Sequence, residues 1–558
     1  MRRFRDAHRA RERRKKIDGA PSKAYRLDMF RTTSPQRPLF GVESRLDATK
    51  RARLERTWAH QFRGAALPLI DENRFARFFD DDNGRPNKSV RLVVGVLILK
   101  EGFDLTDEEA LEQLEWNTAW HYALDVLPED AHTCQKTLHN FRGLLLKDND
   151  GGGLFESTTA RLVEAAGLRT GRQRQDSTHI LSNIRLLTRL GLFVETITGF
   201  LEALRKEHPR LCAKLPEELR ERYLDREGYF GDARGTEAPR RLEQAALDVY
   251  ALVRRFDGHR AVSRMEAFVL LRRLYTEQCV PPTTKKPDKI ELQEKPSSSS
   301  LQSPSDPDVT YGHKGKGYEV QLTETCVEGN PFQVVTAVSV NGANESDQHH
   351  VVPALEQTER TCGAAPEELH TDAGYASGDN ILRAKEHGTN LLAPIGSKGP
   401  DEERGNLGHF DFDEAGEQVT SCPIGNVPVA HQATRGMTRL AIFSPVQCHG
   451  CPLRDVCPTE TRGDKRVLPF RATDVAVARR RTEQESPEFK ERHKIRSGIE
   501  ATNSELKRCH GVAKLRVRRK SRVSLSVRLK VLAMNVKRYV EHLARAAAAV
   551  SPVPACSC

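Results

Sequence analysis

Long apolar segments are missing from this sequence. No apolar run approaches the roughly 18 residues that a membrane-spanning helix requires, and the longest candidate, VVGVLIL at 93–99, has the length of a core helix. The N-terminus lacks the apolar region of a secretory signal peptide. Because no export signal accompanies the twelve cysteines, thiols and metal ligands are favoured over disulfides. We therefore expect a cytoplasmic protein with no membrane partner.

Acidic residues are in the minority. The chain has 88 Lys and Arg against 77 Asp and Glu, a net charge of +11, and the excess is concentrated in two segments. Residues 1–16 carry nine basic and two acidic residues, and residues 507–538 carry twelve basic residues and no acidic one. Such runs suit a disordered arm or a solvated helix face, and both can lie along phosphate backbones. A nucleic acid is therefore the favoured partner, ahead of an anionic membrane surface.

Helical patterns dominate the first half of the chain, and its 558 residues predict two to four domains. Residues 60–146 look helical throughout, and Thr106 and Glu109 have the spacing of a capping box. A second helical block at 185–280 precedes a segment at 285–308 rich in Lys, Pro and Ser, which we expect to be a flexible linker. One apolar face in each block supports this interpretation: Val90, Val93, Val94, Leu97 and Ile98 in the first, and Leu242, Ala246, Val249, Val253 and Phe256 in the second.

Strand patterns follow the linker. YEVQLTET at 318–325 alternates apolar and polar residues, and QVVTAVSV at 333–340 is rich in β-branched residues before an Asn341-Gly342 turn. ELHTD at 368–372 precedes a helix from about 378 to 387, which Gly388 stops, and a short strand at LLAPI. Together with a short strand that we expect to end near Asp176, these elements predict a mixed α/β sheet.

Three carboxylates stand out by position. We expect Asp176 and Asp372 to end two strands of one sheet, and Glu500 to lie on a helix that packs beside them. Two strand-end acids and one helix acid can converge on hard divalent cations, which prefer oxygen ligands. Two such ions about 3.5–4 Å apart would hold the attacking and leaving oxygens of a phosphoryl transfer. The alternatives are a turn or helix cap for each aspartate and a solvated helix residue for Glu500.

The stretch HKIRSGIEATNSELKRCHG at 493–511 predicts one polar helix. His493, Arg496 and Lys507 lie seven before, four before and seven after Glu500, so all four share one narrow stripe. Arg496 and Lys507 would grip the DNA strand that is cut. Glu505 competes with Glu500 but points about 140° away, and Gly498 would cost about 1 kcal/mol within a helix.

The spacing of Arg496, Glu500 and Lys507 resembles the tyrosine-arginine-glutamate-lysine signature of bacterial insertion-sequence transposases of the DDE type. DST at 176–178 and TDAGY at 371–375 are similar to the motifs that carry the two aspartates in that family. The helical segment at 60–146 is similar to the family's N-terminal domain. The family tyrosine is His493 here.

This resemblance implies an α/β (mixed) fold with an RNase H-like catalytic domain, a helical N-terminal domain, a helical insertion and a Cys-rich insertion. It also implies a triad of Asp176, Asp372 and Glu500 that binds Mg²⁺ or Mn²⁺. Water would attack the phosphodiester at the transposon end, and the freed 3′-OH would attack target DNA. We expect a homo-oligomer on DNA because two ends are joined. The expected divisions are a basic arm at 1–59, the helical domain at 60–150, the catalytic core at 165–184 and 307–400, the helical insertion and linker at 185–306, the Cys-rich insertion at 401–475, and the catalytic helix with a basic segment at 476–545.

A second constellation consists of Cys448, Cys451 and Cys457 in CHGCPLRDVC, with Cys422 upstream. Two cysteines separated by two residues suit tetrahedral Zn²⁺, and the other pair could close a four-thiolate structural site. His431 or His449 could replace one thiolate, and free buried thiols are the alternative.

The basic C-terminal segment begins with LRVRRKSRV at 515–523, and its Arg516, Arg518 and Arg519 are candidate DNA contacts. Leu525, Leu529, Leu532 and Val536 then have helical spacing and predict an amphipathic helix that docks onto the sheet. Two other functions stay open: a metal-dependent nuclease of the same fold that cuts without joining, and a non-catalytic DNA-binding derivative.

Overall fold

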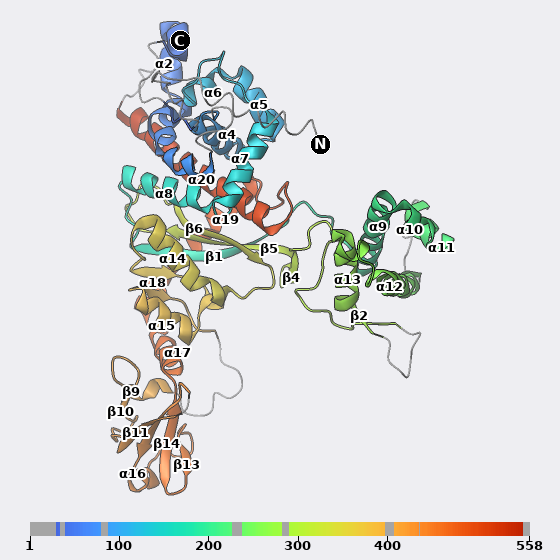
Figure 1. The fold of residues 1–558 in the computed structure, drawn as a ribbon. Helices are drawn as coiled ribbons and strands as arrows, with labels where there is room; N and C mark the ends of the chain where they lie inside the picture. The colour runs from blue at the N-terminus through green and yellow to red at the C-terminus, as the bar shows by residue number, and fades with distance from the viewer. Residues whose placement is uncertain are drawn as a thin grey trace, which may run out of the picture.

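The computed structural model describes residues 30–33, 40–79, 87–225, 237–281, 290–396, 407–434 and 436–550. The basic run predicted at 1–16 lies outside these ranges. Within them the fold is mixed α/β, as the sequence predicts, and a central sheet separates N-terminal helices from an extended lower part (Figure 1). Every helix in the described ranges is too short or too polar to cross a lipid bilayer.

The N-terminal part is helical. Thr106 and Glu109 form the predicted capping box, because Glu109 N donates to Thr106 Oγ1 at 3.2 Å and Thr106 N donates to the Glu109 carboxylate at 2.7 Å. The elements are η1 (Val42–Arg45), α2 (Ala48–Glu55), α3 (Trp58–Gln61), η2 (Phe62–Ala66), η3 (Leu67–Leu69), η4 (Asn73–Phe78), α4 (Val90–Gly102), α5 (Asp107–Trp116), α6 (Thr118–Ala123), α7 (Gln135–Lys147) and α8 (Gly152–Ala165).

The helix α4 differs from its prediction. The sequence predicts one apolar face, but the structure buries α4 on all sides, including Leu92, Val96 and Leu99 between the predicted positions. The cause is α20 (Lys520–Val550), which packs against α4 on one side and against the sheet on the other. A helix that is apolar all round belongs in a core.

The central sheet has the strand order β6-β5-β1-β7-β8, and β4 also pairs with β5. β1 is antiparallel to β5 and parallel to β7, which is parallel to β8. The predicted turn at Asn341-Gly342 is wrong, because both residues still pair with β5. The strands are β1 (Arg172–Ile180), β4 (Thr310–Gly312), β5 (Gly315–Thr325), β6 (Val335–Gly342), β7 (Glu368–His370) and β8 (Asn390–Leu392).

The outer edge of β6 is capped by amide side chains. Asn535 of α20 accepts from Val335 N at 3.0 Å and donates to Val335 O at 2.8 Å, while Gln357 of α14 (Val351–Cys362) accepts from Val338 N at 3.0 Å. Backbone groups of an edge strand need such partners when they are buried. These contacts confirm that the C-terminal helix docks onto the sheet.

Apolar burial joins the N-terminal helices to the sheet. Val531, Leu532 and Met534 of α20 are fully buried in a cluster that also contains residues of α4, α8, β5 and β6. The helices predicted as a separate domain at 60–150 thus share one hydrophobic core with the sheet. This shared core fixes the position of the N-terminal helices relative to β1.

The helical insertion has its own apolar cluster. The segment 285–308 is only partly described, and its residues 300–307 are packed, contrary to the predicted flexible linker. Leu301 and Asp306 are fully buried, and Asp306 accepts from the Tyr318 hydroxyl at 2.9 Å. The insertion contains α9 (Arg189–Glu207), α10 (Pro209–Ala213), α11 (Glu217–Arg220), η5 (Glu221–Asp225), α12 (Glu237–Phe256), η6 (Val262–Arg264), α13 (Glu266–Gln278), β2 (Cys279–Val280) and β3 (Glu291–Leu292).

The lower part in Figure 1 follows β8 and returns to the sheet through α17 (Ala472–Glu483), which packs against α15 (Gly378–Glu386). Its four-stranded sheet has the order β11-β12-β14-β13. Its remaining elements are η9 (Leu407–His409), β9 (Asp411–Phe412), β10 (Val419–Ser421), β11 (Ala430–Ala433), β12 (Arg439–Phe443), α16 (Pro445–His449), β13 (Glu460–Arg462) and β14 (Lys465–Phe470).

Candidate active site

Asp176 lies in the middle of β1, four residues before its end, so the prediction of a strand-terminal aspartate is wrong. Alternate β1 side chains face opposite sides of the sheet. Gln175 faces α14 and donates to His350 O at 3.0 Å. Arg174 faces the segment before α19 (Ile499–Cys509), where it donates to Ile495 O at 3.0 Å. Asp176 shares the face of Arg174 and therefore points at the segment that carries Glu500.

Both carboxylate oxygens of Asp176 have partners. Oδ1 accepts from Arg496 Nη2 at 2.9 Å, and Oδ2 accepts from Asn503 Nδ2 at 3.0 Å. The residue is only 9% exposed. Burial raises the pKa of Asp176 above its ordinary value, although the Arg496 guanidinium opposes that shift. Asp176 is thus a fixed, poorly solvated carboxylate.

Asp372 lies two residues after β7, the parallel neighbour of β1. Its Oδ1 accepts from Gly374 N at 2.8 Å, which caps the short helix η8 (Ala373–Tyr375). Its Oδ2 accepts from Arg496 Nη2 at 3.4 Å. The alternative of a turn residue therefore describes this aspartate, which also contacts the guanidinium that holds Asp176.

Glu500 lies in the first turn of α19. The single helix predicted for 493–511 is wrong: α18 (Pro487–His493) is followed by the 3₁₀ segment η10 (Lys494–Gly498), and α19 starts after it. The reason is visible at Gly498, where a β-carbon would lie 2.0 Å from the Arg174 guanidinium. The absent side chain admits Arg174 against the backbone of η10.

The predicted stripe nevertheless faces the site. His493 Nε2 donates to Thr371 O at 2.8 Å, beside Asp372. Lys507 is close enough to Asp176 for the two charges to interact, and burial lowers the pKa of Lys507. The competing Glu505 pairs with Arg538 at 2.7 Å and so faces away from Glu500, as predicted.

Three carboxylates from distant segments meet one guanidinium. Arg496 lies 2.9 Å from Asp176, 3.4 Å from Asp372 and 3.7 Å from Glu500. Three negative charges and one positive charge leave a formal charge of −2. Across the described residues, no three His, Cys, Asp or Glu side chains are close enough together to hold a metal ion in this conformation.

Two groups beside the triad were not identified from the sequence. Asn503 lies three residues after Glu500 and on the same stripe, so helical spacing was a usable signal. Gln321 of β5 donates to Asp347 Oδ1 at 2.7 Å and accepts from the buried Tyr375 hydroxyl. Only the register of β5 against β1 brings Gln321 opposite Ser177, and no local pattern reveals it.

The arginines predicted to contact DNA after α19 are engaged within the protein. Arg516 donates to Leu105 O at 2.9 Å, and Arg518 donates to Asn183 O at 2.6 Å. Arg519 pairs with Glu266 of α13. These arginines fasten the segment between α19 and α20 to three other parts of the chain, which the sequence pattern could not indicate.

The four cysteines lie in the lower part of the molecule. Cys422 follows β10, Cys448 lies in α16, and Cys451 and Cys457 follow it. All four are half-buried. Burial raises the pKa of Cys448, and the charge of Arg466 opposes this shift. The pKa is raised further by three other cysteines, Cys457, Cys451 and Cys422. Cys422, Cys451 and Cys457 thus lie close enough to Cys448 to affect its charge, although among the described residues the four thiols are not close enough together to hold a metal ion in this conformation.

His431 and His449, the alternative ligands, are exposed. His431 Nε2 donates to Val419 O at 3.1 Å.

Two protein-family models match this chain. The family described as "Transposase domain (DUF772)" matches residues 59–144, and the family described as "Transposase DDE domain" matches residues 421–540. The second range contains the cysteines and Glu500, whereas Asp176 and Asp372 lie outside both ranges. No curated protein and no solved structure gives a significant match. Both matched families are transposase domains, one in the N-terminal and one in the C-terminal part of the chain, and together they support an insertion-sequence transposase of the DDE type.

Proposed function

We propose that this transposase cuts and joins the DNA ends of an insertion sequence by divalent-metal-dependent phosphoryl transfer, with Asp176, Asp372 and Glu500 as the catalytic carboxylates. The convergence of these three side chains on one guanidinium supports the proposal. The strand order of the sheet, with β1 central and antiparallel to β5 but parallel to β7, is consistent with the RNase H-like fold that the DDE family implies.

The donor set fits Mg²⁺ or Mn²⁺. Both cations prefer carboxylate oxygens, and the surplus formal charge of −2 is one that a divalent cation would neutralise. When bound, such ions hold the attacking and leaving oxygens in line and offset the charge that develops on the phosphoryl group. In their absence the guanidinium of Arg496 balances part of the negative charge.

The chain's own residues supply positioning. Asn503 holds one oxygen of Asp176, and Arg496, which also contacts Asp372 and Glu500, holds the other. His493 ties the end of α18 to the backbone beside Asp372. Lys507 stands beside Asp176 with part of its hydration removed, so it is suited to pair with a phosphate oxygen of the bound strand. We propose DNA-contact roles for His493, Arg496 and Lys507 on this basis.

The direct test measures cleavage and end binding separately. Asp176→Ala, Asp372→Ala and Glu500→Ala should each abolish cleavage of a duplex that carries the element's end, while binding of that duplex stays largely intact. Glu505→Gln is the matched control, because this neighbouring glutamate pairs with Arg538 and faces away from the site. Substantial residual cleavage in any one alanine variant would remove that residue from the triad.

Joining separates a transposase from a nuclease of the same fold. Ends supplied already nicked, with a free 3′-OH, should give products joined to target DNA. Cut ends without joined products would favour the nuclease, and binding with neither reaction would favour a non-catalytic derivative. Because two ends must be joined, we expect at least a dimer on DNA, which the mass of the complex will report.

For the four cysteines we propose a structural Zn²⁺ site. Thiolate ligands and their clustering in a small subdomain suit zinc, and the effect of Cys422, Cys451 and Cys457 on the Cys448 pKa supports their proximity to Cys448. The apolar cluster of this subdomain is small and includes Cys422, Cys448 and Cys457 at its border. A metal ion would compensate for so small a core.

A further inference from the structure

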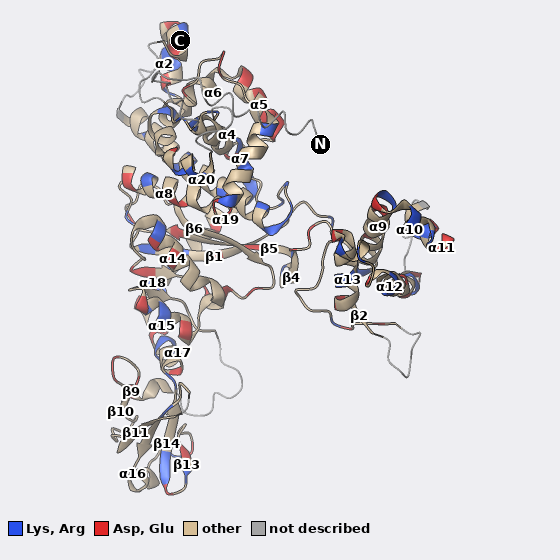
Figure 2. Ribbon diagram, in the orientation of Figure 1, with Lys and Arg blue, Asp and Glu red and all other residues tan. Residues whose placement is uncertain are grey.

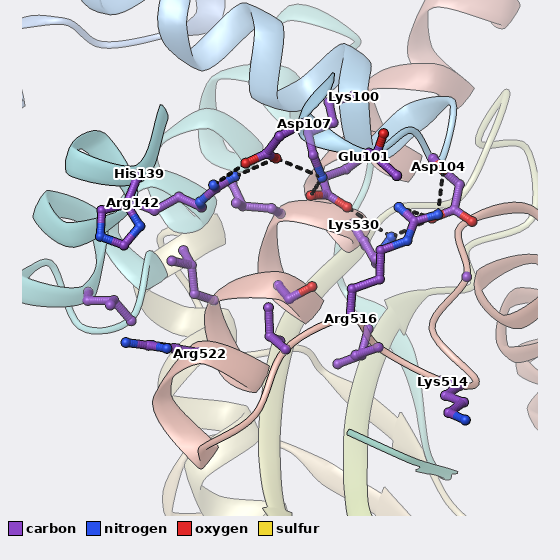
Figure 3. Close-up of a pocket in the computed structure, with 18 of the residues that line it drawn as sticks. Lys100, Glu101, Asp104, Asp107, His139, Arg142, Lys514, Arg516, Arg522 and Lys530 are labelled. Carbon is purple, nitrogen blue, oxygen red and sulfur yellow. Dashed lines mark hydrogen bonds and ion pairs between the residues drawn. The ribbon is translucent and has the colours of Figure 1, made fainter. Parts of the chain in front are cut away.

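A cavity of about 540 Å³ lies between the N-terminal helices and the C-terminal segment. Its wall comes from α4, α5 and α7 on one side and from residues 511–530, which link α19 to α20 and begin α20, on the other (Figure 3). The cavity therefore exists only because α20 packs against the N-terminal helices.

Acidic side chains in the cavity are neutralised. Glu101, Asp104 and Asp107 each contact two cationic side chains within 4.0 Å. The pairs are Glu101 with Lys100 and Lys530, Asp104 with Lys530 and Arg516, and Asp107 with Lys100 and Arg142. Four cations on three acids leave this network positive.

Two further cations line the cavity, Lys514 and Arg522. Both are exposed, and neither has an acidic partner within 4.0 Å in the part of the chain that the structure describes. Figure 3 shows Arg522 on the same side of the cavity as His139 and Arg142, and Lys514 on the opposite side. The six cations and three acids give a formal charge of +3. Figure 2 shows the same excess of Lys and Arg on the segment between α19 and α20.

The floor of the cavity is held in one conformation. Asp104 adopts a left-handed backbone with φ 51°. At Gly511, which has φ +59°, a β-carbon would lie 2.6 Å from the Asp104 carboxylate. The Arg516 guanidinium also joins these two segments, because it donates to Asp104 O at 3.1 Å. A preformed cationic surface loses little conformational freedom when it binds an anion.

Two elements connect this cavity to the candidate active site. α19 has Glu500 in its first turn and ends just before Gly511. β1 continues beyond Asp176 to Ile180, and the next residue, Leu181, forms an isolated parallel bridge with Lys514. Five strand residues span about 17 Å, which equals about five base-pair steps of 3.4 Å. Lys507 of α19 lies between the two ends of this path and interacts with Asp176.

From this geometry we propose that the cavity, through Lys514 and Arg522 at its rim, binds the phosphate backbone of the duplex about five base pairs from the phosphodiester at Asp176. The proposal rests on the proposed function in taking DNA as the polyanion. It assigns the N-terminal helices and the C-terminal segment to one DNA site, with contacts that are independent of base sequence.

The test compares full-length protein with the double variant Lys514→Ala/Arg522→Ala. Binding of a fluorescent 30-base-pair duplex of arbitrary sequence is measured by anisotropy between 50 and 200 mM salt. Each lost phosphate contact lowers the slope of log affinity against log salt by about 0.9. We expect a slope lower by roughly 2, so that raising the salt from 50 to 200 mM weakens binding by the variant roughly tenfold less than binding by the wild type. Lys206→Ala/Arg210→Ala, which removes two exposed cations from α9 and α10, should leave both values unchanged.

Ethylation interference on the element's end locates the contact. Ethylation of phosphates about five base pairs from the cut should block binding by the wild-type protein. The same ethylation should have no effect on binding by the double variant. An unchanged salt slope in the double variant overturns the proposal. Thermal stabilisation of the wild type by inorganic pyrophosphate, with unchanged duplex affinity in the double variant, overturns it in favour of a small-anion site. If the wild type cleaves the element's end and the double variant binds DNA as well as the wild type does, this phosphate site is refuted and the proposed function stands. If the double variant loses binding as expected but the wild type cleaves no DNA, the proposed function is refuted and this site stands.

Discussion

The guanidinium of Arg496 lies 2.9 Å from the carboxylate of Asp176, although 320 positions separate the two residues in sequence. The same group is the shared counter-ion of Asp372 and Glu500. Removal of Arg496 would leave three carboxylates without their shared cation. A divalent cation at this site would balance the same three carboxylates. The metal ion and the Arg496 guanidinium are therefore alternative counter-ions for them.

Arg496→Ala should lower the free energy of unfolding by about 1–3 kcal/mol in metal-free buffer, because the largely buried carboxylate of Asp176 loses its charged partner. Added Mg²⁺ or Mn²⁺ should then raise the melting temperature of the variant more than that of the wild type. Thermal melts with and without each cation measure both effects.

Arg496→Lys is the control, because it keeps the positive charge and loses the two-nitrogen contact. It should fall between the wild type and Arg496→Ala in its response to metal. An alanine variant whose melting temperature responds to metal no more than the wild type would show that the three carboxylates do not share a cation site.

Asn503 offers a test of positioning. Its amide holds Asp176 Oδ2 at 3.0 Å, and groups that orient metal ligands typically change metal affinity or activity by about 10–100-fold. Asn503→Ala should therefore shift the Mg²⁺ concentration needed for half-maximal cleavage upward by about tenfold. The measurement is cleavage rate against Mg²⁺ concentration.

Asn503→Gln, which keeps the amide on a longer stem, is the matched variant and should recover part of the shift. If Asn503→Ala lowers the maximal rate without moving the Mg²⁺ dependence, Asn503 does not act through the ligand Asp176.

Much of this site could be predicted from local spacing in the sequence. The helical offsets of His493, Arg496 and Lys507 from Glu500 placed them on one face, and the fold keeps that face toward the site even though η10 interrupts the helix. A side-chain stripe survives a short 3₁₀ segment because three or four residues still span about one turn. The strand pattern predicted that Asp372 ends a strand, and Asp372 lies two residues beyond the end of β7.

Other features depended on partners far away in the chain. Nothing near Asp176 indicates that β1 continues past it, because the continuation pairs with β5. The Ser- and Pro-rich composition at 290–308 suggested flexibility, but Tyr318 and Arg273 each donate to this segment. The arginines after α19 looked free because their acceptors, such as Leu105 O and Asn183 O, are unrelated in sequence.

The proposed zinc site predicts a stoichiometric metal. Purified protein should contain one Zn²⁺ per chain by elemental analysis, and Cys448→Ser should lose it. Because a small apolar cluster supports this subdomain, loss of zinc should make β11–β14 more susceptible to limited proteolysis. Cys134→Ser, at an exposed thiol in the N-terminal part, is the control and should keep the zinc. Metal-free protein with all four thiols freely titratable would refute the site.

A buried histidine predicts how stability depends on pH. His510 is fully buried between α19 and α4 and donates from Nδ1 to Glu101 O at 3.2 Å. Burial lowers the pKa of His510 below its ordinary value, and the nearby charges of Lys537 and Lys530 lower it further. The hydrogen bond to Glu101 O and the charge of Glu505 oppose this shift. The unfolded chain therefore takes up this proton first as the pH falls from about 6.5. Below that pH the unfolded state binds more protons, so the free energy of unfolding falls with falling pH.

His510→Gln keeps an N–H donor and removes the titration. Its free energy of unfolding in urea should depend less steeply on pH than that of the wild type, by up to about 1.4 kcal/mol per pH unit below pH 6.5, with little difference in slope between pH 7 and 8. His132→Gln, which replaces an exposed histidine of the N-terminal part, is the matched control. Equal slopes for His510→Gln and the wild type between pH 5 and 6.5 would mean that the imidazole is protonated as easily in the folded protein as in the unfolded chain.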